Sequence, residues 1–185
     1  MYIKGRVVTI RGIEKEDLPL LKDLMNSVEV ENMTVRDHFP ISMYQEEQWY
    51  MSNITKSTCN KYIIETEKDG AVGMISIEDI DWRNRSFQVP LKILPSKCSQ
   101  VGIGVDAHMA MLRYAFDQMQ MHRAFGVTLE YNQASLNMQR LCGYTVEGRK
   151  RSAVYKNGKY HDLILTSLLR DEYYKFVEEE EYWED

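Results

Sequence analysis

The N-terminal part of the chain changes from an alternating to a helical spacing of apolar side chains. Arg6 to Ile13, "RVVTIRGI", alternates and is rich in β-branched residues, which predicts a strand. Asp17 and Pro19 then suit the cap and the first turn of a helix. The apolar residues that recur at helical spacing in it are Leu18, Leu21, Leu24, Met25 and Val28. A second helix is predicted from Ser42, which fits a capping box with Gln45.

Strand patterns follow in the middle of the chain. Lys61 to Glu67 and Ala71 to Asp81 flank the turn Lys68-Asp69-Gly70 and predict a hairpin. The next run, Ser86 to Leu94, has the composition of a strand but contains Pro90. Because proline cannot donate a ladder hydrogen bond, Pro90 is expected at an edge, at a bulge or where two strands separate.

The second half of the chain continues the succession of helices and strands. After "SQVGIG" a helix is predicted to about Gln120, followed by a strand from Ala124 to Tyr131. A short helix around Ser135 to Leu141 then leads to Gly143, which suits a helix C-cap. Asn157-Gly158 between two strand patterns is the strongest short signal for a closing hairpin.

This order of elements predicts an α/β (α+β) fold with a single mixed, mostly antiparallel, twisted sheet of six to seven strands. Helices are expected on both faces of that sheet. The 185 residues fit one domain, over residues 1–175. Residues 176–185 form an acidic run that is typical of a solvated C-terminal tail.

Composition narrows the classes of function. With 44% apolar and 28% charged residues, the chain is expected to fold rather than stay disordered. A formal net charge of −5 argues against a nucleic-acid partner. No apolar run approaches the roughly 20 residues of a membrane span and the start does not resemble a signal peptide, so we expect a cytoplasmic protein without a membrane partner. Three cysteines without Cys-x-x-Cys spacing indicate neither a disulfide framework nor a metal site.

Two glycines one residue apart stand where a strand pattern changes to a helix pattern, in "SQVGIGVDAHMA". The first turn of a helix has free N–H groups and the positive end of the dipole, and glycines let an anion approach the backbone. Gly102 and Gly104 therefore suit a phosphate group, although paired glycines also occur in turns that bind no ligand. The third glycine of a dinucleotide fingerprint and the Gly-Lys-Ser/Thr of a P-loop are both missing.

Several segments in register carry a more specific signal. They are "VTIRGIEKEDLPLL", "EDIDWRNRSFQV", Gly102-Ile103-Gly104 with its helix, "NQASLNMQRLCGYTVEGRKR" and "VEGRKRSAVYKNGKYHDLILTSLL". Together they resemble the GNAT superfamily of acetyl-coenzyme A-dependent N-acetyltransferases, in the branch of ribosomal-protein N-terminal, spermidine and amino-sugar acetyltransferases. The resemblance covers nearly the whole chain. It implies an amine N-acetyltransferase that works in a ternary complex with acetyl-CoA as co-substrate.

The resemblance also implies a binding site for coenzyme A. In the superfamily the fourth and fifth strands splay apart, and the pantetheine arm enters the gap and pairs with the fourth strand. Pro90 then matches the interruption, and Ile93 and Leu94 are implied to face the arm. The backbone amides implied to hold the pyrophosphate are those of Gln100, Val101, Gly102, Ile103 and Gly104. Further cofactor-binding residues implied by the resemblance are Asn132, Asn137 and Arg140.

The chain departs from the superfamily at its usual catalytic positions. The glutamate often used as base falls at Gln88, the tyrosine often used as acid falls at Gln139, and Ser99 replaces the arginine or glutamine that opens the phosphate loop. The motif Asn132-Gln133-Ala134-Ser135 resembles one in ribosomal-protein acetyltransferases whose serine is proposed as the acid, so Ser135 is the catalytic candidate. The base glutamate of that group falls at Val154. Ser135 equally suits a first-turn or cap position of a short helix.

Other ionisable residues stay open as bases or acceptor contacts. His38 lies between the first two predicted helices, where the superfamily binds acceptors, and Glu147 lies on a late strand. His161 and Asp162 are adjacent on the last strand and so face opposite sides, which argues against a dyad. His108 shares a helix face with apolar residues, which is typical of packing.

The acceptor is expected to be a primary amine, and its class stays open. Without a strong base, an α-amine with a pKa of roughly 7.7–8.0 is an easier acceptor than a lysine-like amine at about 10.4. This slightly favours a protein N-terminus over a polyamine or an amino sugar. Two alternatives remain, a catalytically weak or inactive acyl-CoA-binding regulatory module and an interaction domain without a ligand. The oligomeric state is open, with a homodimer as one option.

Overall fold

A computed structural model of the protein describes residues 2–35, 39–54 and 60–183, so His38 and Cys59 lie outside the described residues. The strands are β1 (Ile3–Lys4), β2 (Val8–Arg11), β3 (Lys61–Thr66), β4 (Gly70–Ser76), β5 (Glu78–Asp81), β6 (Ser86–Gln88), β7 (Leu91–Ile93), β8 (Arg123–Leu129), β9 (Thr145–Lys156) and β10 (Lys159–Leu169). The helices are η1 (Lys15–Asp17), α1 (Leu18–Asn26), α2 (Val28–Asn32), α3 (Met43–Ile54), η2 (Pro95–Lys97), α4 (Ile103–Asp117), α5 (Gln133–Leu141) and α6 (Arg170–Glu179).

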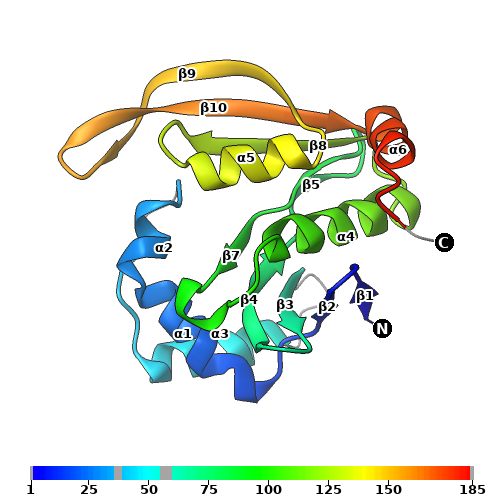
Figure 1. The fold of residues 1–185 in the computed structure, drawn as a ribbon. Coiled ribbons are helices and arrows are strands. Elements are labelled where there is room, and N and C mark those ends of the chain that lie inside the picture. Colours follow the sequence, from blue (N-terminus) through cyan, green and yellow to red (C-terminus); the bar gives the residue numbers. More distant parts are fainter. Residues whose placement is uncertain (1, 36–38, 55–59, 184–185) are drawn as a thin grey trace.

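The strands form two sheets that are joined by two long, bent strands. One sheet has the order β1-β2-β3-β4-β7 and the other β5-β6-β8-β10-β9 (Figure 1). Only Ile77 separates β4 from β5, and only Val89 and Pro90 separate β6 from β7, so each pair runs from one sheet into the other. Among the described pairings, that of β6 with β8 is parallel and the others are antiparallel. The predicted mixed, mostly antiparallel architecture is confirmed, but the single sheet of six to seven strands is two five-stranded sheets. The strand count is higher because these two strands divide at their bends and the short β1 adds another.

Pro90 marks the point where the two sheets separate. Before it, Phe87 of β6 pairs with Ala124 of β8; after it, β7 pairs with β4 and with no other described strand. Pro90 has no N–H to continue the ladder toward β8, while its carbonyl accepts a hydrogen bond from Ser76 N–H at 3.0 Å. The interruption predicted at this proline is confirmed, and it leaves a gap between β7 and β8.

Helices bury apolar side chains against both faces of the sheets, as predicted. On one face, α4 contributes Ala107, Met111 and Leu112 to the main core, which also contains Phe87 of β6 and Ala124 of β8. On the other face, α1 and α3 cover a second core. The buried residues of that second core are Leu18, Leu20, Leu21, Leu24, Val30, Ile63 and Leu94.

Of the helix boundaries predicted near the N-terminus, one is confirmed and another differs from the prediction. The capping box is confirmed, because Ser42 N–H donates to Gln45 Oε1 at 2.8 Å and Gln45 N–H donates to Ser42 Oγ at 3.2 Å. The first helix ends at Asn26, since Ser27 leaves the helical conformation and its hydroxyl accepts from Val30 N–H to cap α2. The single helix predicted through Val28 is therefore two helices.

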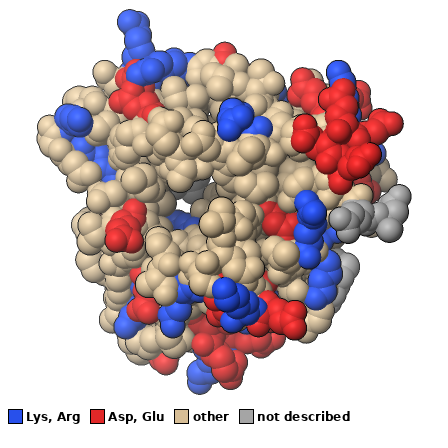
Figure 2. Space-filling view, in the orientation of Figure 1, with Lys and Arg blue, Asp and Glu red and all other residues tan. Residues whose placement is uncertain are grey.

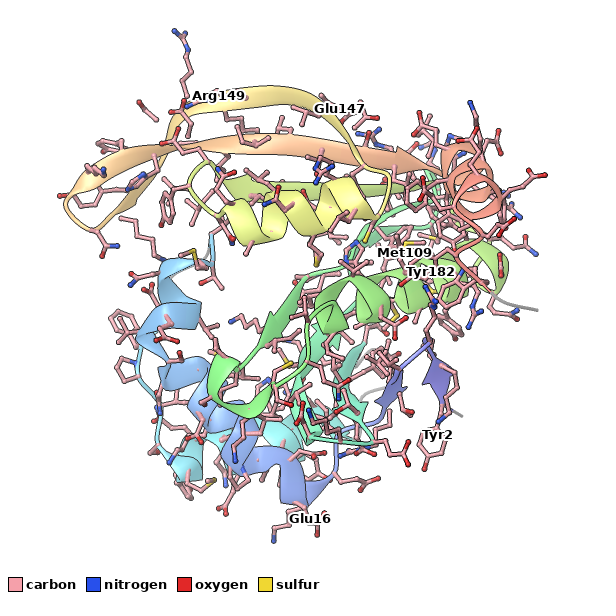
Figure 3. The ribbon with its side chains drawn as sticks, viewed as in Figure 1. Tyr2, Glu16, Met109, Glu147, Arg149 and Tyr182 are labelled. Carbon is pink, nitrogen blue, oxygen red and sulfur yellow. The ribbon has the colours of Figure 1, made fainter. Side chains whose placement is uncertain are left out.

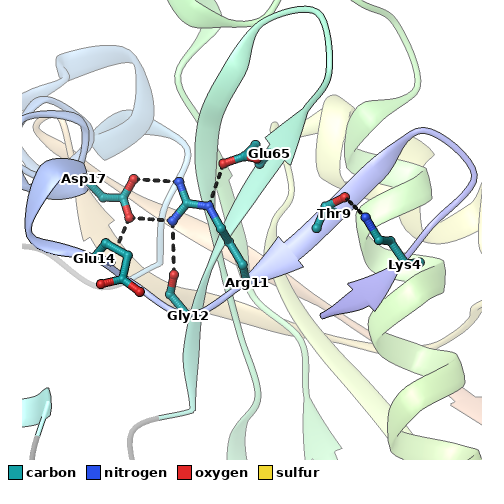
Figure 4. A network of polar contacts seen from close by, with 7 residues as sticks. All are labelled: Lys4, Thr9, Arg11, Gly12, Glu14, Asp17 and Glu65. Atoms are coloured by element: carbon teal, nitrogen blue, oxygen red, sulfur yellow. Dashed lines mark hydrogen bonds and ion pairs between the residues drawn. The ribbon is translucent and has the colours of Figure 1, made fainter. Parts of the chain in front are cut away.

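Asp17 does not cap α1 with its side chain, which corrects the sequence prediction. Its carboxylate instead accepts hydrogen bonds from Arg11 Nη1 at 2.7 Å and Nη2 at 2.9 Å, and from Glu14 N–H at 2.8 Å (Figure 4). Arg11 Nε also donates to Glu65 of β3. The hydrogen bonds to Asp17, and then those to Glu65, raise the pKa of Arg11 above its ordinary value. This network ties the end of β2 to the start of α1.

The acidic C-terminal run is not a separate tail, which corrects the boundary predicted at residue 176. Helix α6 continues to Glu179, and Phe176, Val177, Tyr182 and Trp183 pack against the main core. Tyr182 Oη donates to Asp106 of α4 at 3.3 Å, and Figure 3 shows Tyr182 next to α4. Apolar residues interleaved with the glutamates anchor the segment, while its acidic side chains gather on the surface over α6 (Figure 2).

Residues 2–35, 39–54 and 60–183 show neither a membrane-spanning helix nor a cluster of metal ligands. In this part of the chain no helix has both the length and the apolar character needed to cross a membrane. The same residues contain no group of three or more His, Cys, Asp or Glu side chains arranged to hold a metal ion.

Candidate functional site

The loop before α4 has the backbone geometry of an anion site. Gly102 adopts a left-handed conformation with φ of +88°, which favours glycine, and directly precedes the helix. Asp106 N–H is the first to bond within the helix, to the Gly102 carbonyl at 3.0 Å. The N–H groups of Ile103, Gly104 and the next residue therefore have no acceptor in the helix. The predicted pyrophosphate loop thus has free donors at the positive end of a 15-residue helix.

The acidic side chain in the first turn of α4 does not compete for this site. Asp106 accepts hydrogen bonds from the backbone N–H groups of Arg6 at 2.8 Å, Val7 at 2.8 Å and Val8 at 3.0 Å. Its charge is therefore directed to the N-terminal turn between β1 and β2. Val101, by contrast, exposes its side chain fully to solvent, so only its backbone is available to a phosphate.

Strand β7 presents free backbone groups to the gap. Pro90 and Leu94 make ladder hydrogen bonds to β4, with Ser76 and Val72 respectively, and Lys92 is in register with Met74 between them. In an antiparallel pair the residues between such bonds direct their N–H and C=O groups to the opposite edge. Leu91 and Ile93 therefore offer backbone donors and acceptors on the side of the gap, where an extended amide-containing arm can pair with them.

Ile93 and Leu94, predicted together, lie in different environments. A Cβ atom on Gly104 would lie 3.6 Å from Ile93 Cδ1 and 3.6 Å from Met138 Sδ, so Ile93 lies between α4 and α5. Leu94 is buried in the second core, and its N–H and carbonyl are bonded to Val72 and Lys97. For Ile93, a contact with the arm of coenzyme A stays a proposal. The buried position of Leu94 does not support such a contact.

Three residues predicted to bind the cofactor follow β8, namely Asn132, Asn137 and Arg140. One caps α5 and the other two lie on its exposed face. Asn132 is the N-cap of α5, where its Oδ1 accepts from Ser135 N–H at 3.0 Å and its Nδ2 donates to the Met33 carbonyl at 2.9 Å. Asn137 and Arg140 are exposed on α5. One amide hydrogen of Asn132 is thus engaged with the residue that follows α2.

Ser135 ends a buried chain of hydrogen bonds that includes Gln139. The Gln139 amide accepts from Thr166 Oγ1 at 3.0 Å and donates to Thr128 Oγ1 at 3.2 Å, and Thr128 Oγ1 lies 3.5 Å from Ser135 Oγ. The network needs Gly126, because a Cβ atom there would lie 2.6 Å from both Gln139 Nε2 and Thr166 Oγ1. Gln139 is therefore a buried linker between α5 and the sheet, and Ser135 occupies the first turn of α5.

Neither Gln88 nor Glu147, the two positions considered for a base, offers a free carboxylate. Gln88 Nε2 donates to Asp79 at 2.6 Å. Glu147 forms a bidentate pair with Arg123 at 2.8 and 2.5 Å, and this pairing lowers the pKa of Glu147. Figure 3 shows Glu147 on β9, at the side of the molecule away from α4. A carboxylate held this way is a poor proton acceptor.

Two of the histidines are buried in different ways. His108 Nε2 lies 3.0 Å from Tyr144 Oη, its Nδ1 is buried with no partner among the described residues, and burial lowers the pKa of His108 to about 4. The expected packing role is confirmed. His161 lies edge-on to Tyr131, with its Nδ1 3.6 Å from Glu130 Oε1. Its neighbour Asp162 faces elsewhere and binds Arg149, so the two do not form a dyad.

His161 lines an open cavity of about 450 Å³ under the β9–β10 hairpin, together with Glu130, Tyr131, Arg149, Asn157 and Lys159. Helix α2 borders this region, because Tyr131 Oη donates to the Asn32 carbonyl at 2.7 Å. Figure 2 shows a hollow near the centre of its view, between the layer of β8 to β10 and the layer of α1 and α4.

Sequence reasoning missed a basic residue beside the gap. Lys92 lies on β7 between two apolar residues, and its Nζ lies 3.9 Å from Met25 Sδ of α1. The signal was present in "PLKIL", where a lysine alternates with residues expected to face the core. No motif pointed to it, since its importance depends on the separation of β7 from β8.

The fold and the loop geometry define a class of protein. A sheet splayed at Pro90, free backbone on β7 and an anion site at the start of α4 fit a coenzyme A thioester, with its phosphates at α4 and its arm in the gap. A family model described as an acetyltransferase (GNAT) domain matches residues 8–145. The chain belongs to this GNAT acetyltransferase family, and it is an acetyl-CoA-dependent N-acetyltransferase.

Individual relatives are distant but match over most of the chain. The SPbeta prophage-derived uncharacterized N-acetyltransferase YokL of Bacillus subtilis is 24% identical over 172 residues, 93% of this chain and 95% of the relative. The putative ribosomal N-acetyltransferase YdaF of the same organism is 31% identical over 106 residues, 57% of each chain. The fold resembles the crystal structure of spermidine N-acetyltransferase from Vibrio cholerae in complex with CoA and spermine, with a TM-score of 0.81, 20% identity and coverage of 90% of this chain and 98% of that chain.

Proposed function

We propose that the protein transfers the acetyl group of acetyl-CoA to the α-amine of a protein or peptide N-terminus. The observation that carries this choice is the absence of a free carboxylate base among the described candidates. Gln88 stands at the usual position and is bound to Asp79, and Glu147 is neutralised by Arg123. An acceptor that is already partly neutral is therefore favoured.

The amine must be unprotonated to attack the thioester carbonyl. An α-amine has a pKa of roughly 7.7–8.0 and is partly neutral at physiological pH, whereas the primary amines of a polyamine resemble lysine at about 10.4. Positioning and backbone donors supply much of the acceleration, and acid–base help adds about 10²–10⁴-fold. A site without a strong base thus suits an α-amine better than a polyamine, although relatives are named for spermidine.

Ser135 is proposed to assist departure of the thiolate. As the N–C bond forms and the C–S bond breaks, the amine releases a proton and the sulfur takes one up. Thr128 Oγ1 accepts from Gln139, so its own hydrogen is available to Ser135 Oγ at 3.5 Å. The Ser135 hydroxyl then keeps its own hydrogen free to donate to the sulfur.

Binding of the co-substrate is proposed for a defined set of groups. The amides of residues 100–104 hold the pyrophosphate, Leu91 and Ile93 pair with the arm, and Asn132 donates its second amide hydrogen. Asn137 and Arg140, exposed on α5, reach the outer part of the cofactor. The unbridged Cys98 and Cys142 fit the cytoplasm as the proposed compartment, and a homodimer stays a proposal for ultracentrifugation to test.

Thiol release from acetyl-CoA tests the proposal with three acceptor classes, namely peptides beginning with Ser or Ala, spermidine and amino sugars. Turnover of the peptides with kcat/KM above that for spermidine supports it, and faster turnover of spermidine contradicts it. Ser135→Ala is expected to lower kcat by about 10–100-fold without changing the Kd of coenzyme A, while Ser135→Thr keeps part of the activity. An unchanged kcat in Ser135→Ala, where chemistry limits the rate, would remove Ser135 from the mechanism.

A further inference from the structure

Lys92 occupies the face of β7 that is opposite to α4. Its neighbours Leu91 and Ile93 lie on the α4 side, where a Cβ atom on Gly104 would come within 4.0 and 3.6 Å of their side chains. Because side chains alternate along a strand, Lys92 projects to the other face, next to Met25 of α1. It is therefore a basic group on the α1 and α2 side of the gap.

The charged groups around Lys92 are paired with one another rather than with it. Glu31 of α2 accepts a hydrogen bond from Lys156 Nζ of β9 at 2.7 Å, and Glu78 of β5 lies 4.0 Å from Lys61 Nζ of β3. Within the described parts of the chain, no carboxylate lies at ion-pair distance from Lys92 Nζ. Burial, and then the charge of Lys61, lower the pKa of Lys92 from its ordinary value of 10.5, while the charges of Glu78 and Glu31 partly oppose this shift.

Coenzyme A and the acceptor are expected on opposite faces of the gap between β7 and β8. The N-terminus of α4 and the amides of residues 100–104 lie on one face, so the phosphates of coenzyme A occupy that side. An arm that lies between β7 and β8 then leaves the opposite face to the acceptor. Figure 2 shows a hollow between the layer of β8 to β10 and the layer of α1 and α4, with basic atoms visible at it.

We propose that Lys92 recognises the acceptor by binding a carboxylate that lies close to the amine to be acetylated. This inference rests on the proposed function and adds the chemical class of the acceptor, an α-amine with a carboxylate a few bonds away. Two sources offer that chemistry, a peptide N-terminus with Asp or Glu at its first or second residue, and a free amino acid. In both, the half-buried Lys92 ammonium, which contacts Met25 Sδ and no carboxylate among the described residues, gains a charge-assisted hydrogen bond.

The positive charge of Lys92 also explains how an acceptor amine can become neutral in a site that has no strong base. A positive group near the acceptor disfavours its protonated form and so lowers the pKa of the amine. It also repels a polycation such as spermidine, which carries several charges. The carboxylate of the acceptor in turn offsets the cost of removing the Lys92 ammonium from water. The carboxylate and the ammonium therefore stabilise each other's charged form.

Matched acceptors that differ in one carboxylate test the inference. The pairs are peptides beginning Ser-Asp and Ser-Asn, peptides beginning Asp and Asn, and a free amino acid with its amide, and spermidine is the polycation. The wild type is expected to favour the carboxylate member of a pair about tenfold in kcat/KM. Lys92→Gln is expected to bring that ratio close to one, and Lys92→Arg to keep it. Lys15→Gln is the control for charge, because Lys15 is exposed in η1 and precedes Glu16, which Figure 3 shows at the end of the molecule opposite to β9.

Binding of the same acceptors to the protein saturated with coenzyme A gives a second readout. Equal use of both members of each pair by the wild type, or a preference that survives Lys92→Gln, overturns the inference. Binding of acidic peptides that depends on Lys92, without thiol release, supports the site and overturns the proposed function. Preference for acidic peptides over the amino acid supports the inference and identifies the N-terminus as the source, and the reverse preference supports it with the amino acid as the source. An unchanged Kd of coenzyme A in each variant verifies the fold.

Discussion

Ser99 is held by Asp69, a residue of the turn between β3 and β4. Ser99 Oγ donates to Asp69 Oδ1 at 2.7 Å and Ser99 N–H donates to Asp69 Oδ2 at 3.0 Å. The side-chain bond and then the backbone bond lower the pKa of Asp69. At the position where the superfamily has a long polar side chain, this chain thus uses a short one to anchor the phosphate loop to the first sheet.

Loss of that anchor is expected to weaken coenzyme A binding. In Asp69→Ala both hydrogen bonds disappear and the loop is no longer held, so we expect a roughly three- to tenfold higher Kd by calorimetry. Asp69→Asn keeps an oxygen acceptor for Ser99 and removes a negative charge near the phosphates, so its affinity should equal or exceed that of the wild type. Asp23→Ala, at an exposed position of α1, controls for net charge. Equal affinities of all three variants would show that the anchor has no effect.

The two glycines of the loop are expected to respond differently to alanine. Gly102 has φ of +88°, where a side chain costs about 1–2 kcal/mol, so Gly102→Ala should lower the melting temperature and weaken coenzyme A binding several-fold. Gly104 has room, since an added Cβ would make ordinary contacts at 3.6 Å, and alanine favours the helix by about 1 kcal/mol. Gly104→Ala should therefore be at least as stable as the wild type in thermal unfolding. Greater stability of Gly102→Ala would contradict the left-handed loop.

Gly126 is expected to be the least replaceable glycine of the second sheet. In Gly126→Ala the new Cβ would lie 2.6 Å from Gln139 Nε2 and Thr166 Oγ1, and such overpacking costs about 1–3 kcal/mol. Gly148→Ala on β9 is the matched control, because no atom lies within 4 Å of its added Cβ. Urea unfolding of both variants measures the difference. If Ser135 depends on the Gln139 network, Gly126→Ala should also lower kcat, whereas Gly148→Ala should not.

His108 is expected to make the protein less stable at mildly acidic pH. Its pKa falls from about 6.5 in the unfolded chain to about 4 in the fold, so below pH 6.5 the unfolded state binds a proton that the folded state does not. Stability is therefore lost between pH 6.5 and 4, by about 2 kcal/mol from pH 7 to pH 5. Urea titrations at the two pH values should show this loss in the wild type and in His122→Gln, but not in His108→Gln. The same pH dependence in all three proteins would rule out His108 as its source.

Local signals explain which parts of the fold were predictable. The Ser42–Gln45 box and the Asn157-Gly158 turn depend on neighbouring residues, and Asn157 and Gly158 adopt the positive φ values of 51° and 82° that such a turn needs. Pro90 predicted a break because its missing N–H is a property of the residue itself. The roles of Asp17 and of the acidic C-terminus were mispredicted, because distant partners, Arg11 for one and the main core for the other, decide them.

The candidate site divides in the same way. The sequence by itself determined the glycine loop at the start of α4, the interruption at Pro90 and the missing catalytic glutamate, since each follows from residue type and order along the chain. Only the tertiary structure decided that Leu94 turns to a core while Ile93 stays at the gap, and that Gln139 is a buried linker. It also decided that Lys92 lies beside Met25, on the face of β7 opposite to α4. The physical reason is that burial and charge pairing depend on side chains brought together from separate strands and helices, and spacing along the chain does not encode those distances.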